Sequence, residues 1–287
     1  MKLIKQSLLI TAIVSALVAQ SVLATPLSGT VTDEYWGSDD HGYGDVIGNS
    51  NLFDVFSIDW SLDGTELAIT VKTNFADNGL GTFANYTKAD PNGTICGSSE
   101  GPAVCEGISY GDLFLSDHWT PVGTAVNKYD TDDMYQTGTT DWDYGFSLDN
   151  RYENGGTGTW YDLTGVNNAE GIYDSDAFLE NATWRNDQAV AVNRSSAATE
   201  LYSTTWDVNS ESDPGGVTFT FDIAGTTLET SDTIGFHWAM SCGNDTIEGM
   251  FNKPVATPEP GTLMLLTLGL LGLLRMRKTA IANRANI

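Results

Sequence analysis

Alternating apolar and polar residues mark several segments of the chain as β-strands. In ELAITVKTNF (66–75), every second residue from Leu67 to Thr73 falls on one face, which is the period-2 pattern of a half-buried strand. NLFDVFSIDW (51–60) precedes this segment, and the short stretch 62–64 between them has the composition of a turn. The pattern predicts a β-hairpin.

Other segments repeat this alternation, and no segment of the chain between the two apolar ends shows an apolar helical stripe with capping residues. Many short strands separated by Gly, Asn and Asp turns are typical of antiparallel sheets. We therefore predict an all-β body, an antiparallel β-sandwich or jelly roll. The further strands are expected in DLFL (112–115), WDYGFSL (142–148), GVTFTFDI (216–223) and TIGFHWAM (233–240).

The first 24 residues have the three parts of a secretory signal peptide. Lys2 and Lys5 give a positive start, 8–18 is an apolar run, and 22–24 offers small residues for cleavage. This segment is excluded from the fold, and export of the chain is expected.

The segment TPEPGTLMLLTLGLLGLLRMRK (257–278) combines a short apolar run with a basic cluster. Residues 261–274 carry no charge, but 14 residues are few for a bilayer span, which takes about 20. Arg275, Arg277 and Lys278 follow and would stay on the cytoplasmic side. We expect a short membrane helix with the body outside the cell.

The order of these features resembles the PEP-CTERM protein-sorting domain, with Pro258, Glu259 and Pro260 as its Pro-Glu-Pro box. The resemblance covers about the last thirty residues, 255–287, and places the body at 25–254. It implies recognition by the membrane protease-transferase exosortase. It also implies surface attachment or release in a Gram-negative bacterium that makes exopolysaccharide and biofilm.

The body is strongly acidic. Between Thr25 and Thr257 there are 37 acidic and 7 basic residues. Such a charge repels nucleic acid, so no nucleic-acid partner is expected. It keeps an exported protein soluble and attracts cations, including Ca²⁺.

The stretch DEYWGSDDHGYGDVIG (33–48) gathers the first candidate site residues. Its carboxylates on a glycine-rich loop are the oxygen ligands that Ca²⁺ takes, and aromatic rings can stack on sugars. A loop in which Asp side chains cap backbone turns is the alternative. The candidate calcium ligands are Asp39, Asp40 and Asp45, and the candidate glycan-stacking residues are Trp36, Tyr43 and Trp142.

Three cysteines are present. Export permits disulfides, and Cys96 with Cys105 is the pair we predict. Cys242 is then a buried thiol or pairs between chains. His237 and Cys242 lie an odd number of residues apart, which places them on opposite strand faces, and Glu248 is expected in a turn after Cys242. No catalytic residue is predicted.

The leading hypothesis is an exported, exosortase-sorted surface or matrix protein without enzymatic activity. A carbohydrate-binding module is the first alternative, with exopolysaccharide or another glycan as its ligand. A secreted glycoside hydrolase is the second, because paired carboxylates can cleave glycosidic bonds.

Overall fold

The computed structural model describes residues 26–34, 38–39, 42–43, 45–86, 88–93, 107–121, 139–180, 185 and 187–253. They belong to one unit that ends at Lys253, and residues 254–287 form a second unit. The predicted signal peptide (1–24) and membrane segment (261–274) lie outside the described residues. No helix in the described part of the chain is long and apolar enough to span a bilayer.

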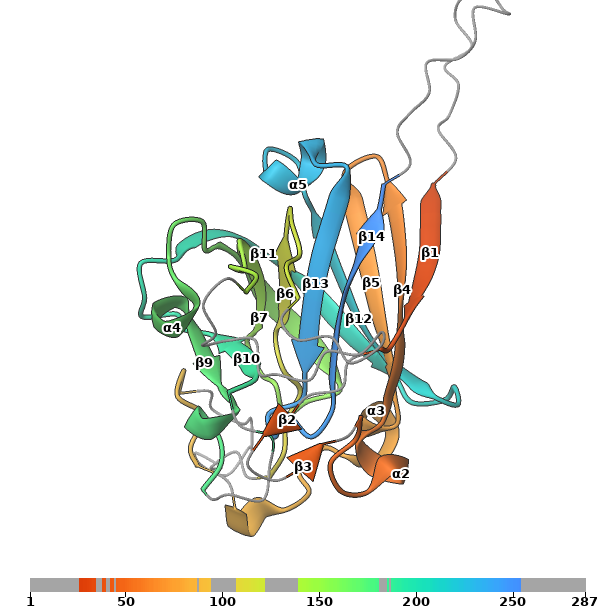
Figure 1. The fold of residues 1–287 in the computed structure, drawn as a ribbon, viewed down its shortest axis with the longest axis vertical. Coiled ribbons are helices and arrows are strands. Elements are labelled where there is room, and N and C mark those ends of the chain that lie inside the picture. Colours follow the sequence, from red (N-terminus) through yellow and green to blue (C-terminus); the bar gives the residue numbers. More distant parts are fainter. Residues whose placement is uncertain are drawn as a thin grey trace, which may run out of the picture. The chain divides into compact units, whose positions relative to one another are not determined.

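Ten strands form one sheet in which every neighbouring pair is antiparallel (Figure 1). The predicted all-β antiparallel body is confirmed. In sheet order the strands are β1 (Leu27–Thr32), β4 (Val55–Asp63), β5 (Glu66–Thr73), β12 (Gly215–Asp222), β11 (Thr199–Asn209), β8 (Gly155–Asp162), β7 (Tyr144–Leu148), β6 (Leu113–Ser116), β13 (Thr233–Ala239) and β14 (Thr246–Asn252).

The sheet curls until its two edge strands, β1 and β14, approach each other, so that it is nearly closed. Trp60 on β4 stacks on Phe251 of β14 with ring centroids 4.2 Å apart. An added Cβ at Gly249 would lie 3.2 Å from Val31 on β1. The inner side of this seam is therefore filled by side chains from both edges.

The strict alternation of residues along β5 and β12 places their apolar side chains on the inner face of the sheet, as predicted. Val71 and Ile69 of β5 pair with Val217 and Phe219 of β12, and all four are fully buried. The β4–β5 hairpin turns at Gly64 and Thr65, one residue later than the sequence indicates, and Gly64 takes the φ of +63° that this turn requires.

Aromatic rings stack through the core. Trp160 lies between Tyr144 and Phe221, with centroid distances of 5.4 and 4.5 Å. These rings come from β8, β7 and β12, which are not all neighbours in the sheet, so the stack joins different parts of the curled sheet across its interior.

Two small sheets and short helices complete the described part. The β9–β10 pair packs on the outer face of β7 and β13 and covers a second apolar cluster. These elements are β2 (Ser38–Asp39), β3 (Gly42–Tyr43), β9 (Ile172–Asp174), β10 (Ala189–Val192), α2 (Ser50–Phe53), α3 (Phe75–Asn78), α4 (Asn168–Gly171), α5 (Thr227–Thr230), and the 3₁₀ turns η1 (Ala84–Tyr86) and η2 (Ser175–Ala177).

The antiparallel ladder gives the body two distinct ends. Because β1 and β14 run in opposite directions, β1 begins at the same end of the sheet at which β14 ends. We call this the entry end, and α5 lies there (Figure 1). The opposite end, called the far end, carries α2 and α3 beside β2 and β3 (Figure 1).

Candidate functional site

The residues predicted to bind calcium are only partly described. Asp39 and Tyr43 lie on β2 and β3, which pair with each other, and only their backbone is described. Trp36 and Asp40 lie outside the described residues. Asp45 is described and half-buried.

Asp45 belongs to a carboxylate cluster with Asp33 and Asp245, in which one oxygen of each lies within 4.8 Å of the others. Asp33 directly follows β1, and Asp245 directly precedes β14. Both positions fall at the far end of the seam, where the two sheet edges meet. The sequence indicated Asp45, but it did not indicate the two partners.

Asp245 is the buried member of this cluster. Its two carboxylate oxygens accept hydrogen bonds from the backbone N–H groups of Val55, at 2.6 Å, and Thr246, at 2.8 Å. Burial, followed by the charge of Asp33, raises the pKa of Asp245 well above its usual range, and Asp45 adds to the effect. The charge of Arg185 acts in the opposite direction but does not cancel the increase, so the three carboxylates together favour a bound proton or a bound cation. Their oxygens are of the type that Ca²⁺ takes, and calcium binding stays a prediction.

A hollow of about 350 Å³ lies at the seam between the two edge strands. Its volume is at the lower end of the range for small-molecule sites. One wall comes from β1 and the residues after it, and the other comes from β14. The lining residues are Thr30, Val31, Thr32, Glu34, Trp119, Glu248, Gly249 and Met250.

Trp119 reaches the hollow by crossing β13. It packs over Gly235, where an added Cβ would lie 2.6 Å from the carbonyl oxygen of His118. The indole N–H then donates to Oε2 of Glu248 at 3.3 Å. Glycine at position 235 thus allows the segment after β6 to lie flat on the sheet and to place an aromatic ring in the hollow.

Glu248 also pairs with His237, its direct neighbour across β13 and β14. The distance from Nδ1 of His237 to Oε1 of Glu248 is 2.8 Å, and Nε2 lies 2.8 Å from the carbonyl oxygen of Ala189. Both ring nitrogens face oxygen acceptors, an arrangement that an imidazolium satisfies by donating twice. Glu248 is on a strand, so the turn predicted there from the sequence is wrong.

Trp142 does not serve as a sugar platform in this structure. Only 2% of its surface is exposed, and its ring lies 5.6 Å from that of His237 in the outer apolar cluster beneath β9 and β10. The prediction of glycan stacking at Trp142 is therefore wrong. Alternation along a strand did not reveal a second layer above the outer face.

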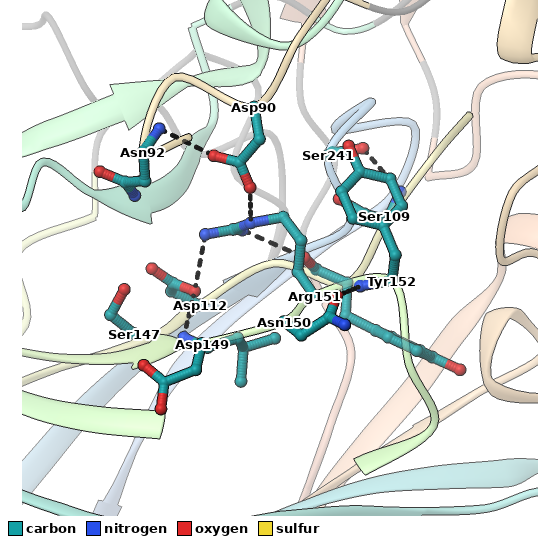
Figure 2. A network of polar contacts seen from close by, with 12 residues as sticks. Asp90, Asn92, Ser109, Asp112, Ser147, Asp149, Asn150, Arg151, Tyr152 and Ser241 are labelled. Carbon is teal, nitrogen blue, oxygen red and sulfur yellow. Dashed lines mark hydrogen bonds and ion pairs between the residues drawn. The ribbon is translucent and has the colours of Figure 1, made fainter. Parts of the chain in front are cut away.

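Arg151 is the centre of a buried ionic network at the far end (Figure 2). Its Nε donates to Asp90 at 2.9 Å, and one Nη donates to Asp112 at 3.2 Å. Burial opposes the charge of Arg151, but Asp112 and Asp90 outweigh it, so the pKa of the guanidinium is raised. Asp112 further accepts from the backbone N–H groups of Leu148 and Val192. These charges fix the loop 88–93 and β10 to the sheet.

Cys242 is a free thiol that is fully buried. Burial raises its pKa to about 12, so the thiol stays protonated and unreactive at neutral pH. A pairing of Cys242 between chains would require exposure that it lacks. Cys96 and Cys105 lie outside the described residues.

Comparison with known families decides the nature of the C-terminal segment. Residues 256–278 match the model of the PEP-CTERM protein-sorting motif. The chain carries a PEP-CTERM sorting signal. No curated protein and no solved structure matches the chain.

The PEP-CTERM match includes Pro258, Glu259 and Pro260 and extends through the basic residues Arg275, Arg277 and Lys278. The motif makes this an exported protein that exosortase recognises and processes at the cell envelope or surface. It matches only the C-terminal segment, so it carries no information about what the β-rich body does.

Proposed function

We propose that this exosortase-sorted protein is a non-enzymatic component of the exopolysaccharide matrix around a Gram-negative bacterium. The sorting motif at 256–278 carries the proposal. Further support comes from the body, where several residues of potentially catalytic type serve the fold. Arg151 is paired with buried carboxylates, His237 with Glu248, and Cys242 is a buried thiol.

Fractionation of producing cells tests this assignment. The wild-type chain should be processed and recovered with the surface matrix, and enzymatic digestion of the exopolysaccharide should release it. A triple substitution Pro258→Ala, Glu259→Ala and Pro260→Ala should leave the unprocessed chain in the membrane fraction. Thr279→Ala, outside the matched motif, is the control and should behave as wild type.

Two results would contradict the proposal. Wild-type protein that is insensitive to digestion of the exopolysaccharide would remove the matrix role. Release of reducing sugar from the producing strain's exopolysaccharide by the purified protein would replace it with the glycoside hydrolase hypothesis.

A second candidate function is glycan binding in the hollow at the seam. Trp119 supplies an aromatic ring there, Glu34 and Glu248 supply carboxylates, and Thr30 and Thr32 lie beside them. Aromatic rings with a few polar groups are the usual lining of small-molecule sites. An exposed edge of a sugar ring can bond to these oxygens while an apolar face lies on the indole.

Affinity electrophoresis in gels containing purified exopolysaccharide tests glycan binding. Trp119→Ala should raise the dissociation constant derived from the retardation at least about tenfold, which corresponds to a loss of about 1.4 kcal/mol in binding free energy. Leu201→Ala is the control, because this exposed residue lies on β11, far along the sheet from both edges. Equal retardation of the two variants would rule out the hollow as the binding site.

A further inference from the structure

Three potential metal ligands converge at the entry end of the body, between the end of β6 and the start of β7. Nδ1 of His118 lies 3.1 Å from Oδ1 of Asp117 and 3.9 Å from Oδ2 of Asp143. The three ligand atoms all lie within 4.8 Å of one another. The cluster is separate from the hollow at the seam and from the acidic residues at the far end.

The carboxylate of Asp143 is held in place by neutral donors. The hydroxyl of Ser116 donates to its Oδ2 at 2.7 Å, and the backbone N–H of Asp117 donates to the same oxygen at 3.1 Å. Outer hydrogen bonds of this kind orient ligating carboxylates in metal sites. Asp143 is therefore positioned before any ligand arrives.

The backbone that carries Asp117 and His118 is also fixed. The hydroxyls of Ser231 and Thr233 both donate to the carbonyl oxygen of Asp117 at 3.1 Å. His118 follows directly and lies over Gly235 of β13, where only glycine leaves room for its backbone. The cluster is therefore supported by the end of β6, by the start of β7 and by β13.

The cluster is partly exposed to solvent. The side chains of His118, Asp117 and Asp143 are 48%, 37% and 17% exposed. Within the described part of the chain, Asp117 and Asp143 each form an ion pair with His118. Two carboxylates beside one imidazole leave a net negative charge, which attracts a cation.

We propose that Asp117, His118 and Asp143 bind a divalent first-row transition cation, with Zn²⁺ as the representative ion. Zinc lies about 2.0–2.2 Å from histidine nitrogen and carboxylate oxygen, which places tetrahedral ligands about 3.3–3.6 Å apart and adjacent octahedral ligands about 2.8–3.1 Å apart. The Asp117 oxygen meets the octahedral spacing relative to Nδ1 of His118, and the Asp143 oxygen needs a shift of about 0.8 Å to reach it. The cation would replace the hydrogen bond between this nitrogen and Oγ of Ser116, which lie 2.9 Å apart. The imidazole favours such cations over Ca²⁺, which prefers oxygen ligands alone.

Calorimetric titration of the full chain in mild detergent, after removal of metals with chelator, tests this site. Wild-type protein should bind Zn²⁺ at a site that His118→Ala weakens at least about tenfold. A tenfold loss is the lower limit seen when even an outer partner of a metal ligand is removed. Ca²⁺ at the same concentration should not displace the bound Zn²⁺.

Asp63→Asn is the matched control, because it removes an exposed carboxylate at the β4–β5 turn, outside the cluster. This variant should bind Zn²⁺ as the wild type does. Asp143→Asn provides a second test, and its thermal unfolding in chelator shows whether the fold is kept. The proposal is overturned if wild type does not bind Zn²⁺, or if His118→Ala and Asp63→Asn bind it equally well. It does not depend on the proposed matrix role.

Discussion

Nε of Arg151 lies 2.9 Å from Oδ2 of Asp90, and both side chains are buried. Asp112 contacts the same guanidinium at 3.2 Å and is also fully buried. These three interior charges are stabilised by one another, by hydrogen bonds with the backbone, and by the ring of Phe178, whose centroid lies 5.1 Å from the guanidinium of Arg151. Removing one of them leaves the others without compensation.

Asp112→Asn should therefore destabilise the body strongly. The loss of one partner from a buried ion pair costs about 3–5 kcal/mol, which lowers the melting temperature by about 6–20 °C in a body of this size. Thermal unfolding followed by circular dichroism measures the change. The exposed control Asp63→Asn should unfold within about 0.5 kcal/mol of wild type, and equal melting of both variants would show that the network adds little stability.

The acidic cluster at the far end should make stability depend on pH. The pKa of Asp245 is raised in the folded state from an ordinary value of 3.8, so the folded protein binds this proton more tightly than the unfolded chain. Its contribution favours folding at low pH and is lost as the pH rises through the raised pKa. Asp45→Asn removes a like charge and should reduce this loss, which raises stability at neutral pH in chelator.

Urea unfolding at a series of pH values, with chelator present, measures this difference. The pKa of Asp54 is also raised, first by burial and then by the charge of Asp45, so the same variant relieves both carboxyls. Asp63→Asn should keep the wild-type pH profile. An Asp45→Asn protein that is less stable than wild type at neutral pH would show that the carboxylate has a favourable partner.

In chelator Asp45→Asn should be the more stable protein, and in calcium the wild type should be. A ligand at about 100 times its dissociation constant stabilises the folded state by about 2.7 kcal/mol, which corresponds to about 5–10 °C in melting temperature. Wild type should gain this increment with Ca²⁺ and much less with Mg²⁺, while Asp45→Asn should gain little from either. Equal shifts with both cations would remove the calcium prediction.

The thiol of Cys242 should resist alkylation in the native protein. It is fully buried, and burial raises its pKa to about 12, so little thiolate is present at neutral pH. Peptide mass spectrometry after iodoacetamide treatment should find Cys242 modified only after denaturation. The same digest tests the predicted Cys96–Cys105 disulfide, and rapid native labelling of Cys242 would contradict its place in the core.

The sequence predicted the strands that bury one face completely. β5 and β12 alternate strictly, so every second residue gives the signal. β11 was missed because Trp206 is the one residue of its eleven that is buried. β14 was missed because Glu248 breaks its apolar pattern, and this buried carboxylate is compensated by His237, which lies on another strand.

Candidate sites were harder to predict than strands because they depend on how the sheet closes. Asp33 and Asp245 are more than two hundred residues apart, and they meet only because β1 and β14 form the two edges of one curled sheet. Asp117 and Asp143 meet because β6 and β7 are paired neighbours. Neither contact can be predicted from the spacing of these residues along the chain.

The common entry end of β1 and β14 determines how the body responds to tension. A pulling force between Leu27 and Asn252 acts on the first hydrogen-bonded pairs of each edge, Leu27 with Leu62 and Asn252 with Thr233. Such a load opens the ladders one pair after another from this end, whereas a shearing load would have to break many pairs together. The nearly closed sheet would therefore yield by peeling its two edge strands, and the first ring contact to separate would be that of Phe251 on β14 with Trp60 on β4.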